Sequence, residues 1–112
     1  MLLNIMYEIR SIPLFDDVFS KIIPLNKQDD FKRRILKLSE NPYAGKPLGY
    51  KYLREIKLDK FRVYYMVFDK EVIVLLITVS DKKTQKKTID FIKQNTHLFK
   101  EIVKNINNKG VM

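Results

Sequence analysis

The stretch that decides the fold covers residues 52–87 and reads YLREIKLDKFRVYYMVFDKEVIVLLITVSDKKTQKK. Three strand-length apolar runs lie within it, at residues 52–58, 61–68 and 71–79. Asp59-Lys60 and Asp69-Lys70 separate the runs with the two-residue spacing of tight hairpins. The pattern predicts an antiparallel three-stranded meander that ends in a lysine cluster.

The last run predicts a central strand. Residues 72–79 are apolar at seven of eight positions, so both alternating faces avoid water and must be covered. In the run before it, residues 61–68, Arg62 lies among aromatic residues and shares a strand face with Tyr64. From the residues alone, Arg62 could be a ligand-binding cation or an ion-paired arginine on an exposed sheet face.

Upstream, the spacing predicts one strand and then two helices. Alternation over residues 5–10 indicates a first strand. Pro13 fits the first turn of a helix that Ser11 could cap and Pro24 would end. The apolar positions of this helix follow helical spacing: Phe15, Val18, Phe19, Ile22 and Ile23.

The second helix is predicted from a cap and a second apolar stripe. Asn26 could cap it, with Asp29 three residues on. Its stripe consists of Phe31, Ile35 and Leu38. Asn41-Pro42 would end the helix, and residues 43–50, rich in Gly and Pro, are predicted to form a loop.

The C-terminal part is predicted to be helical from about residue 84 to 107. Its apolar stripe has a 3-4-3-4-3 spacing and comprises Ile89, Ile92, Thr96, Phe99, Val103 and Ile106. Asn95-Thr96 could instead divide the segment into two shorter helices. The stripe could pack on its own domain, on a second copy to form a homodimer, or on a protein partner.

Together these elements predict a single α+β domain over residues 1–112. Its order is an N-terminal strand, a two-helix hairpin, an antiparallel three-stranded meander and a C-terminal helix, with the strands forming a four-stranded sheet. The 112 residues are 46% hydrophobic, which supports a buried core. The sequence has no cysteine, and no apolar run approaches the roughly 20 residues that span a bilayer, so we expect a cytoplasmic protein without membrane contact.

The charge is unevenly distributed. Residues 1–31 carry 3 basic and 5 acidic side chains and residues 32–112 carry 19 and 8, which gives −2 against +11 within the total of +9. A basic surface of this kind points to a polyanion, most often nucleic acid, or to an acidic protein partner. A surface that is lysine-rich only for solubility is the alternative.

Three segments resemble the RelE/ParE superfamily of bacterial and archaeal toxins. They are Leu53-Arg54-Glu55-Ile56-Lys57-Leu58, Phe61-Arg62-Val63-Tyr64-Tyr65, and Ile77-Thr78-Val79 with the lysines that follow. The resemblance covers about residues 5–90 and leaves 84–107 as a C-terminal helical extension. It implies the toxin of a toxin–antitoxin pair, a ribosome-dependent mRNA endonuclease that inhibits translation without a metal or cofactor. The implied partners are a small acidic antitoxin, the ribosome and mRNA.

The resemblance implies two groups of site residues. Arg62, Lys57 and Lys82 would be catalytic, because cleavage by the RNA's own 2′-hydroxyl needs cations that hold the phosphate and stabilise its developing charge. The predicted RNA-binding residues are Arg54, Lys83, Lys86 and Lys87. Because Arg54 and Lys57 are three positions apart, only Lys57 could share a strand face with Arg62.

Some residues depart from the family pattern. Asp81-Lys82-Lys83 stands where nucleases of the family often carry an arginine, and Thr88 stands where they often carry a tyrosine or histidine. The candidates for the missing proton-transfer group are Tyr43, Tyr64, Tyr65 and, outside the matched region, His97. A DNA gyrase inhibitor of the related ParE branch and a non-toxic interaction module are therefore the alternatives.

Overall fold

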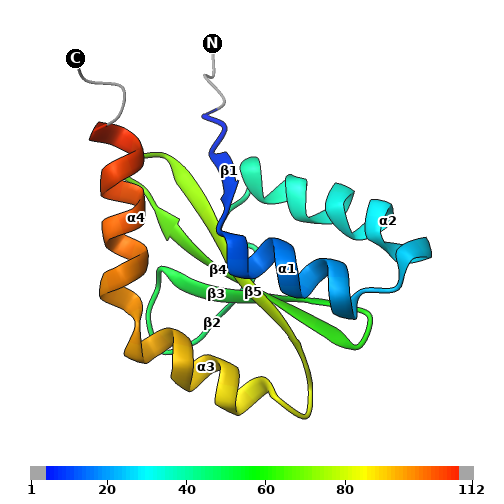
Figure 1. The fold of residues 1–112 in the computed structure, drawn as a ribbon. Coiled ribbons are helices and arrows are strands. Elements are labelled where there is room, and N and C mark those ends of the chain that lie inside the picture. Colours follow the sequence, from blue (N-terminus) through cyan, green and yellow to red (C-terminus); the bar gives the residue numbers. More distant parts are fainter. Residues whose placement is uncertain (1–4, 109–112) are drawn as a thin grey trace.

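The computed structural model describes residues 5–108 (Figure 1). In chain order its elements are β1 (Glu8–Ser11), α1 (Pro13–Ile22), α2 (Leu25–Leu36), the 3-10 helix η1 (Lys37–Ser39), β2 (Lys46–Pro47), β3 (Leu53–Leu58), β4 (Phe61–Phe68), β5 (Ile73–Asp81), α3 (Gln85–Gln94) and α4 (Thr96–Asn108). The α+β class and the order of the predicted elements are confirmed. No helix within the described residues is long and apolar enough to cross a membrane.

The strands form a five-stranded mixed sheet in the order β1-β5-β4-β3-β2. The prediction of four strands was wrong because Lys46–Pro47, inside the predicted loop, pairs antiparallel with Glu55 and Arg54. A two-residue strand is too short to show any alternation in sequence. The meander is confirmed, and β1 joins β5 in parallel, which the two-helix connection between β1 and the meander permits.

The two turns of the meander differ. Asp59-Lys60 forms the predicted two-residue turn, with Asp59 at φ 60°, where a hairpin turn of this length needs a positive φ. The second turn was predicted too short: it runs over residues 69–72, and β5 begins at Ile73. Val72 also has φ 60°, which takes it out of the strand conformation.

Helices cover both faces of the sheet. Phe31 of α2 packs edge-to-face on Phe61 of β4 at 6.3 Å, which places α1 and α2 on the face that carries Phe61. The opposite face is covered by the C-terminal helices, whose buried side chains are Ile92, Phe99 and Val103. In consequence β5 is buried from Ile73 to Ser80, and the predicted central strand is confirmed.

The C-terminal segment forms two helices, as the Asn95-Thr96 alternative predicted. The Asn95 side chain donates to the Phe91 carbonyl, and the helix direction changes there (Figure 1). The apolar stripe packs on its own sheet, so it is not left open for a second copy. Two large hydrophobic side chains of this region stay exposed, those of Phe91 and Leu98.

The predicted helix caps were wrong at both N-termini. Ile12 precedes α1, with Pro13 in its first turn as predicted, while the Ser11 hydroxyl donates to the Asp16 carboxylate. α2 starts at Leu25, ahead of Asn26, and Pro24 occupies the N-cap position with an extended ψ of 139°. β1 is also shorter than residues 5–10, because only Glu8–Ser11 pair with β5.

Asp69 joins three segments at the end of the sheet where β4 turns into β5. The Tyr7 and Tyr43 hydroxyls donate to its two carboxylate oxygens at 2.8 and 2.7 Å. The hydrogen bonds from Tyr43 and then Tyr7 stabilise the ionised carboxylate and lower the pKa of Asp69. The turn, the N-terminal segment and the loop after η1 are thereby tied together.

This contact predicts a pH dependence of stability. A carboxylate whose folded pKa is depressed contributes stability above its unfolded pKa of about 3.9, and that stability is lost as pH falls through the lower folded value. We expect the melting temperature of Asp69→Asn to lie below that of the wild type at neutral pH and to converge with it in acid. Asp29→Asn, an exposed change on α2, is the control. Equal differences at neutral and acidic pH would contradict the role of the Asp69 charge.

Candidate functional site

The strand register places Lys57, Arg62 and Ser80 in one row across three strands. Lys57 of β3 lies directly opposite Arg62 of β4, and Arg62 lies opposite Ser80 of β5. All three project from the face that the C-terminal helices cover only in part. Lys57 is exposed, Arg62 is half-buried and Ser80 is buried. The tight Asp59-Lys60 turn, which fixes the β3–β4 register, therefore also positions the two predicted catalytic cations.

The positive charge of this row is not neutralised. One guanidinium nitrogen of Arg62 donates to the Lys60 carbonyl at 3.0 Å. Among residues 5–108 no carboxylate lies within ion-pair distance of Arg62 or Lys57. Like charges directly opposite each other destabilise a sheet, so this pair does not serve the fold. It is suited to hold an anion between its two side chains.

A second row on the same face contains Glu55, Tyr64 and Thr78. The Glu55 side chain is only 7% exposed, and the Gln85 amide donates to both of its carboxylate oxygens at 3.0 and 3.1 Å. Glu55 was not among the functional residues predicted from the sequence. Its separation of two positions from Lys57 is the signal that could have identified it, since strand residues i and i+2 share a face.

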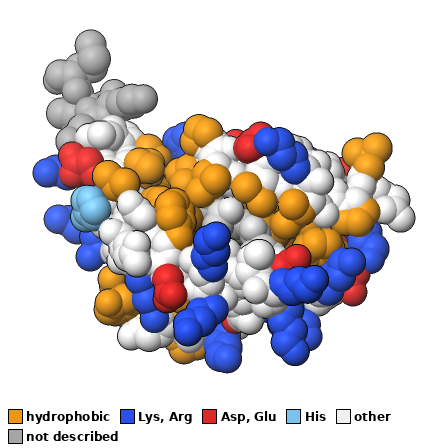
Figure 2. Space-filling model, turned by 60° about the horizontal axis from the view of Figure 1, so that its bottom comes forward, with side chains coloured by type: hydrophobic (Ala, Val, Ile, Leu, Met, Phe, Trp, Pro, Cys, Tyr) orange, Lys and Arg blue, Asp and Glu red, His pale blue; other side chains and the backbone are white. Residues whose placement is uncertain are grey.

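The tyrosines considered for proton transfer are held inside the protein. Tyr64 is fully buried, its hydroxyl lies 2.7 Å from the Ser80 hydroxyl, and burial is the main cause that raises the pKa of Tyr64. The Tyr65 hydroxyl is bonded to the Pro42 carbonyl and the Gly45 amide, and Tyr43 is bonded to Asp69. His97 lies on the exposed side of α4 at one edge of the molecule (Figure 2).

The predicted lysines surround the start of α3. Lys82 and Lys83 are exposed in the turn after β5, where the Asp81 carboxylate accepts from the Thr84 amide and hydroxyl at 3.0 Å each. Lys83, Lys86 and Lys87 border a shallow depression on the outer face of α3, beside Phe91. Figure 2 shows Lys and Arg side chains spread over this side of the molecule with few acidic ones between them. Lys82 lies two residues after Ser80, the β5 member of the Arg62 row.

Arg54 does not join these residues. It lies on the opposite face of β3, where its Nε donates to the Gly45 carbonyl at 2.9 Å and another guanidinium nitrogen donates to the Lys51 carbonyl at 2.7 Å. Its guanidinium also lies over the Tyr43 ring, 5.1 Å from the ring centre. These contacts give Arg54 a structural role in the loop before β3, while RNA binding by Arg54 stays a prediction.

Metal ligands are not clustered in the part of the chain that the structure describes. Within residues 5–108 no group of three His, Asp or Glu side chains is arranged to hold a metal ion.

Solved structures share this fold. The RelBE2 toxin–antitoxin complex of Mycobacterium tuberculosis matches with TM-score 0.62 and 19% identity, over 71% of this chain and 95% of that chain. The intact RelBE toxin–antitoxin complex of E. coli matches with TM-score 0.58 and 23% identity, over 67% and 95%. The isolated E. coli RelE toxin gives 0.58 and 20%, over 77% and 98%. No curated protein sequence matches this chain.

The fold is that of the toxin component of a toxin–antitoxin pair. The family model of the ParE toxin of the type II toxin–antitoxin system, parDE, matches residues 21–86, which is more than half of the chain. The chain therefore belongs to the ParE toxin family, within the RelE/ParE superfamily of toxins.

Proposed function

We propose that this toxin is a ribosome-dependent endonuclease that cleaves mRNA and thereby inhibits translation. The observation that carries the proposal is the unneutralised row of Lys57, Arg62 and Ser80 on an accessible sheet face. Arginine is suited to this task because its planar fork can donate two hydrogen bonds to one phosphate.

The reaction would use the RNA's own 2′-hydroxyl as nucleophile. A bond forms from the 2′-oxygen to phosphorus as the 2′-hydroxyl loses its proton. The bond from phosphorus to the 5′-oxygen breaks as that oxygen takes up a proton from water, which leaves a 2′,3′-cyclic phosphate and a 5′-hydroxyl. Negative charge grows on the non-bridging phosphate oxygens on the way to the transition state. Arg62 and Lys57 would bind those oxygens, and Lys82 would add a point charge beside them.

Glu55 is our candidate for the proton acceptor. Its carboxylate shares a strand face with Lys57, and the Gln85 amide orients it. If Glu55 takes the 2′-hydroxyl proton, Glu55→Gln will slow single-turnover cleavage without weakening the binding of an RNA whose 2′-hydroxyls are methylated. Undiminished cleavage by folded Glu55→Gln would exclude this role.

An acidic antitoxin is the proposed protein partner. Carboxylates placed over the Lys57–Arg62 row would both bind the toxin and block access of RNA. Two of the matched structures are complexes of a toxin with its antitoxin, which supports a partner of this kind.

Inhibition of DNA gyrase is the second candidate. Two observations favour it: the matching family model is that of ParE toxins, and the Glu55 carboxylate is already engaged by Gln85. A gyrase inhibitor would need the basic surface without any proton acceptor.

One pair of assays separates the two functions. We expect the purified protein to cleave mRNA on programmed ribosomes and to leave DNA supercoiling by gyrase unaffected. The products should carry 2′,3′-cyclic phosphate ends, which distinguishes them from products of contaminating nucleases that attack with water. Inhibition of supercoiling without any cleavage would overturn the proposal and assign the gyrase function.

A further inference from the structure

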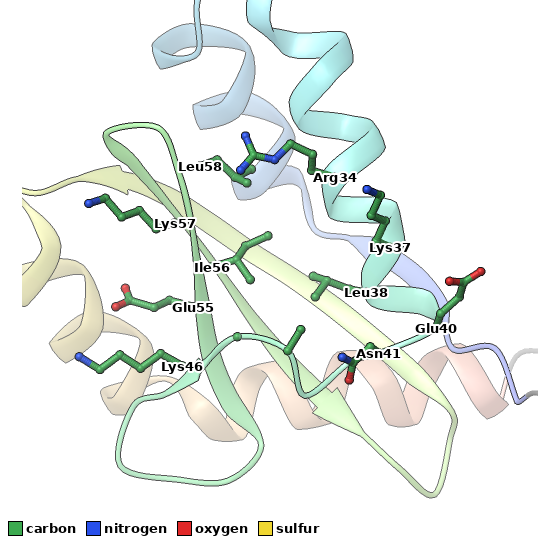
Figure 3. Close-up of a pocket in the computed structure, with 12 residues that line it drawn as sticks. Arg34, Lys37, Leu38, Glu40, Asn41, Lys46, Glu55, Ile56, Lys57 and Leu58 are labelled. Atoms are coloured by element: carbon green, nitrogen blue, oxygen red, sulfur yellow. The ribbon is translucent and has the colours of Figure 1, made fainter.

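A groove lies between α2 and the outer edge of β3 (Figure 3). Its volume is about 640 Å³, within the range of small-ligand sites. Because β2 pairs only with Arg54 and Glu55, the edge of β3 from Ile56 to Leu58 is left without a neighbouring strand. Lys57 lines the groove from the edge of β3, while its side chain projects on the sheet face of Arg62, so the groove and the Lys57–Arg62 row meet at this edge.

The loop wall of the groove is held in place from inside the protein. The Tyr65 hydroxyl accepts from the Gly45 amide at 2.9 Å and donates to the Pro42 carbonyl at 2.7 Å, while Arg54 donates to the Gly45 carbonyl. A Cβ at Gly45 would lie 2.6 Å from the Tyr65 hydroxyl and from the Glu55 carbonyl. The loop therefore lies as close to β3 as glycine permits, and the groove is formed before any ligand arrives.

The lining combines an apolar floor with a rim on which four cations, from Arg34, Lys37, Lys46 and Lys57, outnumber the carboxylates of Glu40 and Glu55. Figure 3 shows Leu38 and Ile56 facing each other across the groove, with Arg34 reaching from α2 toward the end of β3. Lys37, Lys46 and Lys57 have no carboxylate within ion-pair distance among the described residues. The rim thus has free cations for an anion, while the floor can cover a flat apolar ring.

A nucleotide of single-stranded RNA matches this groove, because its flat base can pack on the apolar floor and its phosphate can bind the cations of the rim. We propose that the groove is a subsite for the nucleotide next to the phosphate held by Lys57 and Arg62, with its base against Leu38 and Ile56 and its phosphate near Lys37. This inference rests on the proposed function, because it takes the bound polyanion to be RNA. It adds a site at which the toxin could discriminate among bases.

Binding of a short oligoribonucleotide without ribosomes tests the groove directly. The probe is a fluorescein-labelled strand of about five nucleotides with 2′-O-methyl riboses, which binds but cannot be cleaved. Lys37→Ala should weaken binding about threefold to tenfold and reduce the slope of log affinity against log salt by about 0.7, the loss of one phosphate contact on a single strand. Lys70→Ala, at the exposed β4–β5 turn, is the matched control and should bind as the wild type does.

A second variant tests the place of the base. Ala44→Leu keeps the charge of the groove but fills part of it, so affinity should fall without a change in salt slope. Removing one base from the probe should lower its affinity for the wild type about tenfold, because that base no longer packs in the groove. The same removal should change the affinity for Ala44→Leu little. Circular dichroism confirms that each variant is folded.

Several outcomes would overturn the inference. One is that Lys37→Ala and Ala44→Leu both bind the probe as Lys70→Ala does. Another is that an acidic peptide binds the groove while the probe is insensitive to both variants, which would assign the groove to a protein partner. Ribosome-dependent cleavage is measured separately on Arg62→Ala, so a failure of the proposed function is distinguished from a failure of the groove.

Discussion

Arg62→Ala is expected to reduce ribosome-dependent mRNA cleavage by about a hundredfold or more, the usual scale for losing one preorganised charge-stabilising donor. The fold should survive, because Arg62 forms no ion pair among the described residues and bonds only the Lys60 carbonyl. Arg62→Lys should recover part of the rate, since an ammonium keeps the charge but loses the fork. Single-turnover cleavage on programmed ribosomes measures both variants.

Two further variants show whether the effect belongs to the site. Arg33→Ala removes an exposed arginine of α2, which forms an ion pair with Asp30 at 3.6 Å, and should leave the rate unchanged. Lys83→Ala should weaken RNA binding and make its salt dependence shallower, as expected for the loss of about one phosphate contact. It should not lower the cleavage rate by about a hundredfold, as Arg62→Ala does. Undiminished cleavage by folded Arg62→Ala would remove Arg62 from the mechanism.

Ile77→Ala is expected to lower the free energy of unfolding by about 2–5 kcal/mol. Ile77 is completely buried in β5. It also lies where the register between β4 and β5 shifts, because Tyr64 pairs with Thr78 and Tyr65 pairs with Leu76. Helices and strands enclose this position on all sides, so little around it can collapse into the cavity. Urea denaturation followed by circular dichroism measures the difference.

Leu25→Ala is the control for this loss of stability. Leu25 is 84% exposed at the start of α2, so its truncation should change the free energy of unfolding by no more than about 0.5 kcal/mol. If Ile77→Ala is as stable as Leu25→Ala, the register shift in β5 leaves room for the chain to repack, and Ile77 does not anchor the core.

The local pattern of the sequence was sufficient for most of the fold. The pattern of residues 61–68 and the almost entirely apolar run of β5 each reflect how much of a strand is covered, and the helical stripes reflect which side of a helix faces the core. Asn95-Thr96 also indicated the division between α3 and α4, because an asparagine side chain competes for backbone hydrogen bonds. Such signals are carried by neighbouring residues, so they can be read without knowing the tertiary structure.

The site depended on more than local pattern. Strand alternation placed Lys57 and Glu55 on one face of β3, but only the register of β3 against β4 brought Lys57 opposite Arg62. The approach of Gln85 to Glu55, 30 residues earlier in the chain, follows from the packing of α3 on the sheet.

What the sequence by itself determined was the α+β class, the order of the elements, the meander and the buried central strand, because each of these depends on the solvent exposure of adjacent side chains. The tertiary structure alone decided the fifth strand, the parallel pairing of β1 with β5, the structural role of Arg54 and the groove beside β3. These features arise from contacts between segments distant in the chain, whose formation depends on how all the elements pack together, and no short stretch of sequence records that.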